Sequence, residues 1–189
     1  MKEKIRELSI QLFATKGFKE TSIQDIVDAL HVTKGTFYYY FTSKEQLLMD
    51  IHLDYIDELL RKQEEIIKHP SKSCKEKVSQ IIYMLIHDIE KEGLSANVFF
   101  REIRHLNEEH LALIVPKRDQ FRFNIQQVLE EGIKNKEIRA DLPTDIVTFS
   151  ILGMTNWSYF WFDPNGRVTD KEVSNVFVNI LLEGLELQS

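Results

Sequence analysis

The sequence lacks the features that mark secreted and membrane-spanning proteins. Among 189 residues there is one cysteine, so no disulfide can form within the chain, and the paired cysteines of redox or zinc motifs are missing. No apolar run approaches the ~18–20 residues that cross a bilayer. The N-terminus also lacks the apolar stretch of a signal peptide. We therefore predict a cytoplasmic protein with no membrane partner.

Proline and glycine are scarce too, with four and seven copies. The glycines are scattered, and the chain contains no P-loop, no dinucleotide-binding fingerprint and no GxSxG nucleophile motif. These absences predict a protein that is not an enzyme and has no cofactor. An all-α enzyme that uses an aromatic cavity as its active site remains an alternative, as does a helical module that docks another protein.

Charge is divided unevenly along the chain. The total is 24 basic against 30 acidic residues, a net charge of −6, which argues against a surface that coats nucleic acid as a whole. Residues 1–50, however, carry seven charges of each sign, so the excess acidity lies entirely in residues 51–189. The N-terminal part can therefore approach a polyanion without a net electrostatic penalty.

Apolar residues recur with helical period almost everywhere, and no stretch alternates as a strand would. We predict an all-α fold with two domains, a helix-turn-helix domain over residues 1–50 and a larger helical domain over 51–189. Gly17 is expected to end the first helix, and Thr21 with Gln24 to form the capping box of the second. The later helices are expected at 33–40, 44–68, 73–92, 95–107, 108–135, 143–162 and 169–187.

The helices expected at 22–30 and 33–40 have the spacing of a helix-turn-helix, whose second helix lies in the major groove of DNA. Phe37, Tyr40 and Phe41 stand at i, i+3 and i+4 and should pack inward. The opposite face then carries a cation and several hydroxyl groups, which suit phosphate oxygens and base edges. Its members are Thr33, Lys34, Gly35, Thr36, Tyr38 and Tyr39. An ordinary solvated helix face is the alternative at this point.

Three segments resemble the signature of the TetR family of bacterial regulators, namely residues 21–26 (TSIQDI), 32–41 (VTKGTFYYYF) and 43–48 (SKEQLL). The resemblance covers roughly residues 5–50. It implies a homodimer that binds palindromic double-stranded DNA, usually as a repressor, and a variable C-terminal domain that binds a small effector. It also implies phosphate contacts from Thr21 or Ser22, Tyr38 and Lys44, with Thr33, Lys34, Gly35, Thr36 and Tyr39 facing the groove.

The sequence departs from that signature at the turn of the motif. The family usually has Ala-Gly where this chain has Leu30 and His31, and alanine where it has Val27. A turn glycine commonly supplies a positive φ, which histidine tolerates better than most residues but at some cost. We interpret the difference as a variant turn.

The C-terminal part contains a helix that is apolar on nearly every face, at 143–162, followed by an amphipathic one at 169–187. In proteins that resemble this one, the last two helices pair with their copies in a dimer. Aromatic side chains near arginines further predict a pocket for a hydrophobic anion such as a fatty acyl-CoA. Its predicted members are Phe99, Phe100, Ile103, Arg104, Phe121, Arg122, Trp157, Phe160 and Trp161. Core packing and a solvated basic face are the alternatives.

Two other groups carry weaker signals. His105, Glu109 and His110 lie within two helical turns, but they lack a metal-binding spacing and a third credible ligand, so no metal site is expected. Cys74 lies beside several lysines at a helix start, and a lone cysteine of this kind is usually inert.

Overall fold

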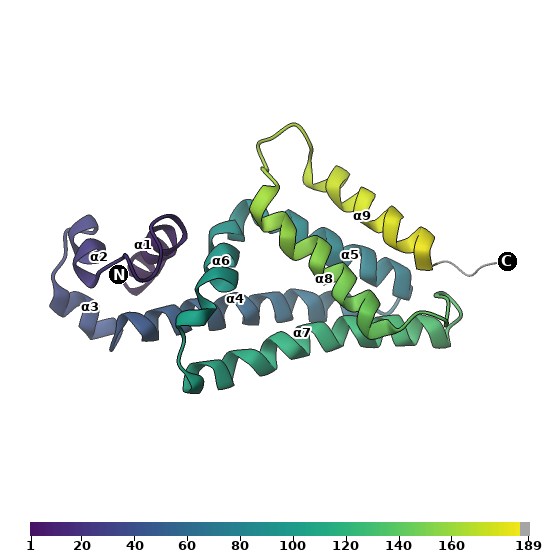
Figure 1. Cartoon of the computed structure of the whole chain (residues 1–189), viewed down its shortest axis with the longest axis horizontal. Coiled ribbons are helices and arrows are strands. Elements are labelled where there is room, and N and C mark those ends of the chain that lie inside the picture. The colour runs from purple at the N-terminus through teal and green to yellow at the C-terminus, as the bar shows by residue number, and fades with distance from the viewer. Residues whose placement is uncertain (186–189) are drawn as a thin grey trace. The chain divides into compact units, whose positions relative to one another are not determined.

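The computed structural model describes residues 1–185, and every regular element in that range is a helix (Figure 1). The predicted all-α class is therefore confirmed. The helices are α1 (Lys2–Thr15), α2 (Ile23–Ala29), α3 (Lys34–Tyr40), α4 (Lys44–Ile67), α5 (Cys74–His87), α6 (Ile89–Glu102), a 3₁₀ turn η1 (Ile103–His105), α7 (Glu108–Lys134), α8 (Thr144–Trp161) and α9 (Asp170–Leu185). Residues 186 and 187 of the last predicted helix lie outside the described residues. No helix of residues 1–185 is long and apolar enough to cross a membrane.

The chain forms two compact units that interleave along the sequence. The first, which we call the head unit, combines Met1–Asp57 with Glu92–Pro116. The second, the body unit, combines Glu58–Lys91 with the chain from Lys117 onward. The predicted domains 1–50 and 51–189 are contiguous, so they do not anticipate the segment 92–116 that packs in the head unit.

The head unit is built on apolar side chains that the helical period brings to one side of each helix. Ile5 and Phe13 of α1, Ile26 of α2 and Phe37 of α3 are all fully buried. Gly17 follows the end of α1 with a φ of +99°, a conformation that costs glycine little, so it ends this helix as predicted. These contacts hold three short helices as one bundle.

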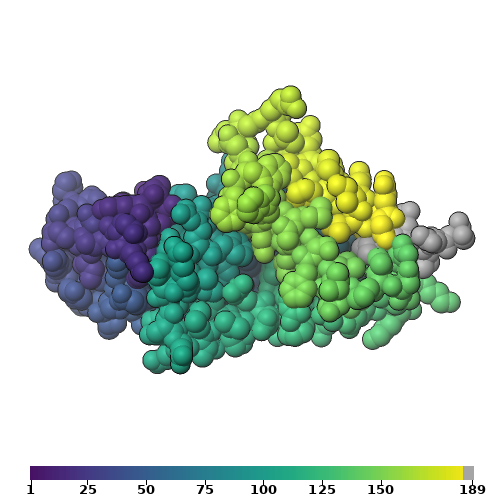
Figure 2. Space-filling model, in the orientation of Figure 1, coloured from purple at the N-terminus to yellow at the C-terminus, as the bar shows by residue number. Residues whose placement is uncertain are grey.

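In the body unit, α5 packs against both α8 and α9. Ile81, Ile82, Leu85 and Ile86 of α5 are at most 1% exposed and form the centre of this packing. Parts of α8 and α9 that face away from α5 remain at the surface, where Figure 2 shows them in green and yellow.

Three predicted helix boundaries were wrong, and one of them is the end of α6, which lies at Glu102, before η1, instead of at residue 107. The helix expected at 73–92 ends at His87, with Asp88 as its C-cap, and α6 starts at Ile89 instead of residue 95. The Asp88 carboxylate accepts a hydrogen bond from Lys62 Nζ at 2.8 Å, a contact between segments 26 residues apart. The break therefore depends on tertiary structure, since neither glycine nor proline marks it in the sequence.

Candidate nucleic-acid interface

Helix α3 is a short helix whose orientation is set by one capping residue and one anchor. The Thr33 side chain accepts a hydrogen bond from the Thr36 backbone N–H at 3.3 Å, as expected for an N-cap. Phe37 is fully buried and packs against Phe41, with ring centroids 5.7 Å apart. Because the inward face is fixed in this way, Lys34, Tyr38 and Tyr39 point out of the head unit, while Tyr40, which was predicted to pack inward, is half-buried.

The outward face of α3 is exposed as its sequence predicts. Tyr39 is 80% and Tyr38 53% exposed, and Thr33, Lys34 and Gly35 are also at the surface. Within residues 1–185, no hydrogen bond or ion pair engages the Lys34 ammonium or the Tyr38 and Tyr39 hydroxyl groups. The face therefore presents one cation and two hydroxyl groups that are available to a ligand.

The turn between α2 and α3 has the positive φ that the sequence suggested. His31 adopts a φ of 54°, in the left-handed region. The turn is closed by backbone hydrogen bonds, from His31 N to Asp28 O at 3.1 Å and from Val32 N to Val27 O at 2.9 Å. A histidine thus holds the position at which family members usually have glycine.

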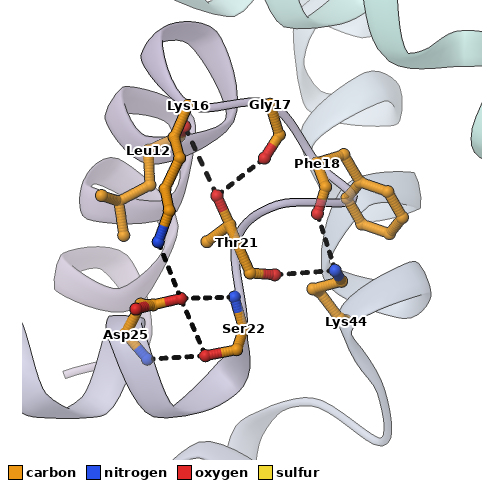
Figure 3. Close-up of polar contacts among 8 residues, drawn as sticks. All are labelled: Leu12, Lys16, Gly17, Phe18, Thr21, Ser22, Asp25 and Lys44. Atoms are coloured by element: carbon orange, nitrogen blue, oxygen red, sulfur yellow. Dashed lines mark hydrogen bonds and ion pairs between the residues drawn. The ribbon is translucent and has the colours of Figure 1, made fainter.

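The start of α2 is capped by Ser22 rather than by Thr21, which corrects the prediction (Figure 3). Ser22 Oγ accepts a hydrogen bond from Asp25 N at 3.1 Å, and Asp25 Oδ2 accepts one from Ser22 N at 2.7 Å. The bonds from the backbone and hydroxyl of Ser22, together with the nearby Lys16 ammonium, lower the pKa of Asp25 to about 2. Ser22 itself stays exposed at this helix start.

Thr21 and Lys44 form part of the framework beneath this surface (Figure 3). Thr21 is fully buried, and its hydroxyl donates to Gly17 O at 2.7 Å. Lys44 Nζ donates to Phe18 O at 2.6 Å and to Thr21 O at 2.7 Å, and lies 4.2 Å from the centre of the Phe18 ring. Partial burial lowers the pKa of Lys44. The structure therefore gives both side chains internal hydrogen bonds, unlike the exposed residues of α3.

The residues of the predicted effector pocket are divided between the two units. Phe99, Phe100, Ile103 and Arg104 belong to the head unit, where Phe99 is buried against Tyr55 with ring centroids 4.9 Å apart. The other members lie in the body unit, and they are Phe121, Arg122, Trp157, Phe160 and Trp161.

Within the body unit, these side chains differ in burial. Phe121 is buried, whereas Trp157, Phe160 and Trp161 are each about half exposed or more. Arg122 lies over the Phe123 ring, 4.0 Å from its centre, and 5.3 Å from that of Phe149. The pocket itself stays a prediction.

The body unit contains a buried polar contact that no sequence motif indicates. Gln63 is fully buried on α4, and its amide donates to Phe121 O at 2.9 Å. Its carbonyl accepts a hydrogen bond from Asn124 Nδ2 at 2.7 Å.

Among the described residues no group of three His, Cys, Asp or Glu side chains is placed to hold a metal ion. His105 instead lies 3.3 Å from a Glu102 oxygen and stacks on Phe18.

Two family models match the chain, one for each part. Residues 5–51 match the model described as bacterial regulatory proteins, tetR family, and residues 71–185 match the tetracyclin repressor-like C-terminal domain. The HTH-type transcriptional repressor KstR2 of Rhodococcus jostii is 28% identical over 181 residues, which cover 95% of this chain and 88% of the relative.

Solved structures resemble the chain over nearly its whole length. The ketosteroid transcriptional regulator KstR2 of Mycobacterium tuberculosis has a TM-score of 0.91 at 24% identity, covering 99% of this chain and 95% of its own. AibR, solved in complex with isovaleryl coenzyme A and operator DNA, has a TM-score of 0.85 at 25% identity, covering 96% and 97%.

Proposed function

The chain belongs to the TetR family and is a DNA-binding transcriptional repressor, not an enzyme, and we propose that it acts as a homodimer whose two α3 helices read a palindromic operator. A hydrophobic or acyl-CoA-type effector releases the dimer from this operator. The outward face of α3 is the observation that carries this proposal. Lys34, Tyr38 and Tyr39 are exposed there on a helix that Phe37 holds in place, and their polar groups have no hydrogen-bond or ion-pair partner within residues 1–185.

We assign different tasks to the residues of this interface. Lys34 and the Tyr38 hydroxyl suit phosphate oxygens, and Ser22 lies at a helix start, where backbone N–H groups favour an anion. Thr33, Gly35, Thr36 and Tyr39 face the groove, where a threonine methyl group can contact thymine. Thr21 and Lys44 support the surface through their internal hydrogen bonds, so we expect their contribution to DNA binding to be indirect.

Dimerisation is supported by the apolar surface of the last two helices. Large apolar side chains are exposed on both helices, and exposed apolar patches mark association surfaces. Those outside the predicted effector pocket are Ile146 and Phe149 on α8 and Val176 and Ile180 on α9. A symmetric partner would also supply the second recognition helix that a palindrome requires.

The effector class is suggested by a relative and by the aromatic and basic residues of the predicted pocket. AibR was solved with isovaleryl coenzyme A, a thioester that combines an apolar acyl group with phosphates.

Release from DNA requires that the effector bind the DNA-incompetent dimer more tightly than the DNA-competent one, and a coupling free energy of ~1–3 kcal/mol is usual. We expect α4 to transmit this preference by changing the separation of the two heads. Equal head separation in free and effector-bound dimers, measured between spin labels, would contradict this route.

DNA binding is tested by selecting duplexes from a random pool with the wild-type protein and titrating the selected duplex. Lys34→Ala should weaken binding and reduce the slope of log affinity against log salt by about 0.9, the value for one lost phosphate contact. Tyr38→Phe should weaken binding as well. Lys134→Ala, which removes an exposed lysine of α7, is the matched control and should change nothing. Unchanged binding by both α3 variants would favour the protein-docking alternative.

A further inference from the structure

The head unit contains a cleft of about 550 Å³ that the DNA-facing surface of α3 does not use. Its walls come from the end of α1 with the following turn, and from the end of α6 with η1. The lining residues are Thr15, Lys16, Gly17, Lys19, Glu20, Arg101, Glu102, Arg104 and His105. Its volume lies in the range of small-molecule sites, ~300–1,000 Å³.

The lining is strongly basic in a chain of net charge −6. Four of its side chains are lysine or arginine and two are glutamate. A concave surface with an excess of one charge sign attracts small ions of the opposite sign. The cleft therefore favours an anion, and its mostly polar lining does not favour a hydrophobic tail.

Some of the charged side chains that line the cleft are paired within the head unit, and others are available to a ligand. Lys16 pairs with Asp25 at 3.1 Å, and the buried Glu102 has an oxygen 3.3 Å from His105 Nε2. Lys19 and Arg104 are exposed, and neither has a hydrogen bond or ion pair within residues 1–185. The two lie on opposite walls.

Arg101 adds a third basic group, beside Arg104. Its only internal hydrogen bond within the described part of the chain is a long one, 3.4 Å to Asn97 Oδ1. Guanidinium groups bind phosphate through parallel N–H donors, and a lysine adds a point charge. A ligand with several phosphate oxygens can accept hydrogen bonds from both walls at once.

We propose that this cleft binds a small phosphate-bearing anion between Lys19 on one wall and Arg101 and Arg104 on the other. The bound anion would link the α1–α2 turn to the α6–η1 segment, both within the head unit. This site goes beyond the proposed regulator role, because it needs neither operator DNA nor the aromatic members of the predicted effector pocket, with which it shares only Arg104.

Calorimetric titration of the full-length protein with inorganic pyrophosphate tests the proposal at constant ionic strength. We expect saturable binding of one pyrophosphate per chain. The double variant Lys19→Gln, Arg104→Gln should bind at least tenfold more weakly. A control double variant, Lys134→Gln, Arg167→Gln, removes the same charge from exposed sites outside the cleft and should bind like the wild type. Circular dichroism of each variant checks that it is folded.

Three results would overturn the proposal. Titration without saturation, or an equal loss of binding in both double variants, would mean that pyrophosphate joins only a diffuse ion atmosphere. A cleft variant that binds the selected DNA duplex more weakly in the absence of pyrophosphate would assign Lys19 and Arg104 to DNA phosphates instead. None of these results would affect the Lys34 and Tyr38 test, so failure of the cleft and failure of the repressor model can be distinguished.

Discussion

At the scale of single residues, His31 carries the clearest strain in the head unit. Its φ of 54° lies in the region that costs a residue with a side chain about 1 kcal/mol or more relative to glycine. His31→Gly should therefore raise the free energy of unfolding by up to about 1 kcal/mol, since part of the gain is offset by the flexibility of glycine in the unfolded chain. Urea denaturation measures this, and His31→Ala, which keeps the strain, should give no gain.

The Asp25 carboxylate should make stability depend on pH. Its pKa is about 2 in the folded chain and 3.8 when unperturbed, because Ser22 and Lys16 stabilise the charged form. This contribution to the free energy of unfolding is complete above about pH 4 and is lost as the pH falls through about 2. Asp25→Asn should therefore be less stable than the wild type at pH 6, and the gap should narrow toward pH 2. A gap that is constant across this range in urea titrations would contradict the assignment.

At the scale of helices, Gly132 allows α7 to approach its neighbours closely. A Cβ atom at this position would lie 2.6 Å from Ile138 Cδ1 and 3.0 Å from Cys74 Cβ. Gly132→Ala should therefore destabilise the body unit by about 1–3 kcal/mol, although alanine favours helix formation. At Gly184 of α9 a Cβ would meet nothing within 4 Å. Gly184→Ala should leave stability unchanged or slightly raised, and thermal unfolding of the two variants compares them.

Most helix boundaries that local chemistry determines were predictable from the sequence, and the exception is the capping box of α2, which Ser22 and Asp25 form instead of Thr21 and Gln24. The start of α3 after Thr33 and the end of α1 before Gly17 depend on neighbouring residues, and both agree with the predicted bounds. The break at Asp88 was not, because a lysine 26 residues away contributes to it. In the candidate nucleic-acid interface too, the sequence predicts what local structure determines and misses what depends on distant residues. Exposure of Tyr38 and Tyr39 follows from helical period, whereas the internal bonds of Lys44 depend on how the bundle closes.

At the scale of the whole molecule, repression of a palindromic operator depends on association of two chains. Ile180 of α9 is 60% exposed, and we expect a partner chain to bury it. Ile180→Asp should shift the protein toward monomer in sedimentation equilibrium and weaken binding to the selected duplex, because burying an unpaired carboxylate is costly. Val168→Asp, in the loop before α9, is the matched control and should leave the dimer intact.

Photocrosslinking from position 39 tests the central claim most directly, because it reports where the α3 face lies on DNA. The Tyr39 side chain is 80% exposed, so a photoreactive phenylalanine analogue can replace it without disturbing the core. We predict crosslinks to the major groove at two symmetric positions, one helical turn or a multiple of it apart. The same analogue at position 134 of α7 should give none. Failure to crosslink from position 39 under conditions where the duplex is bound, or crosslinks at a single position, would contradict the account.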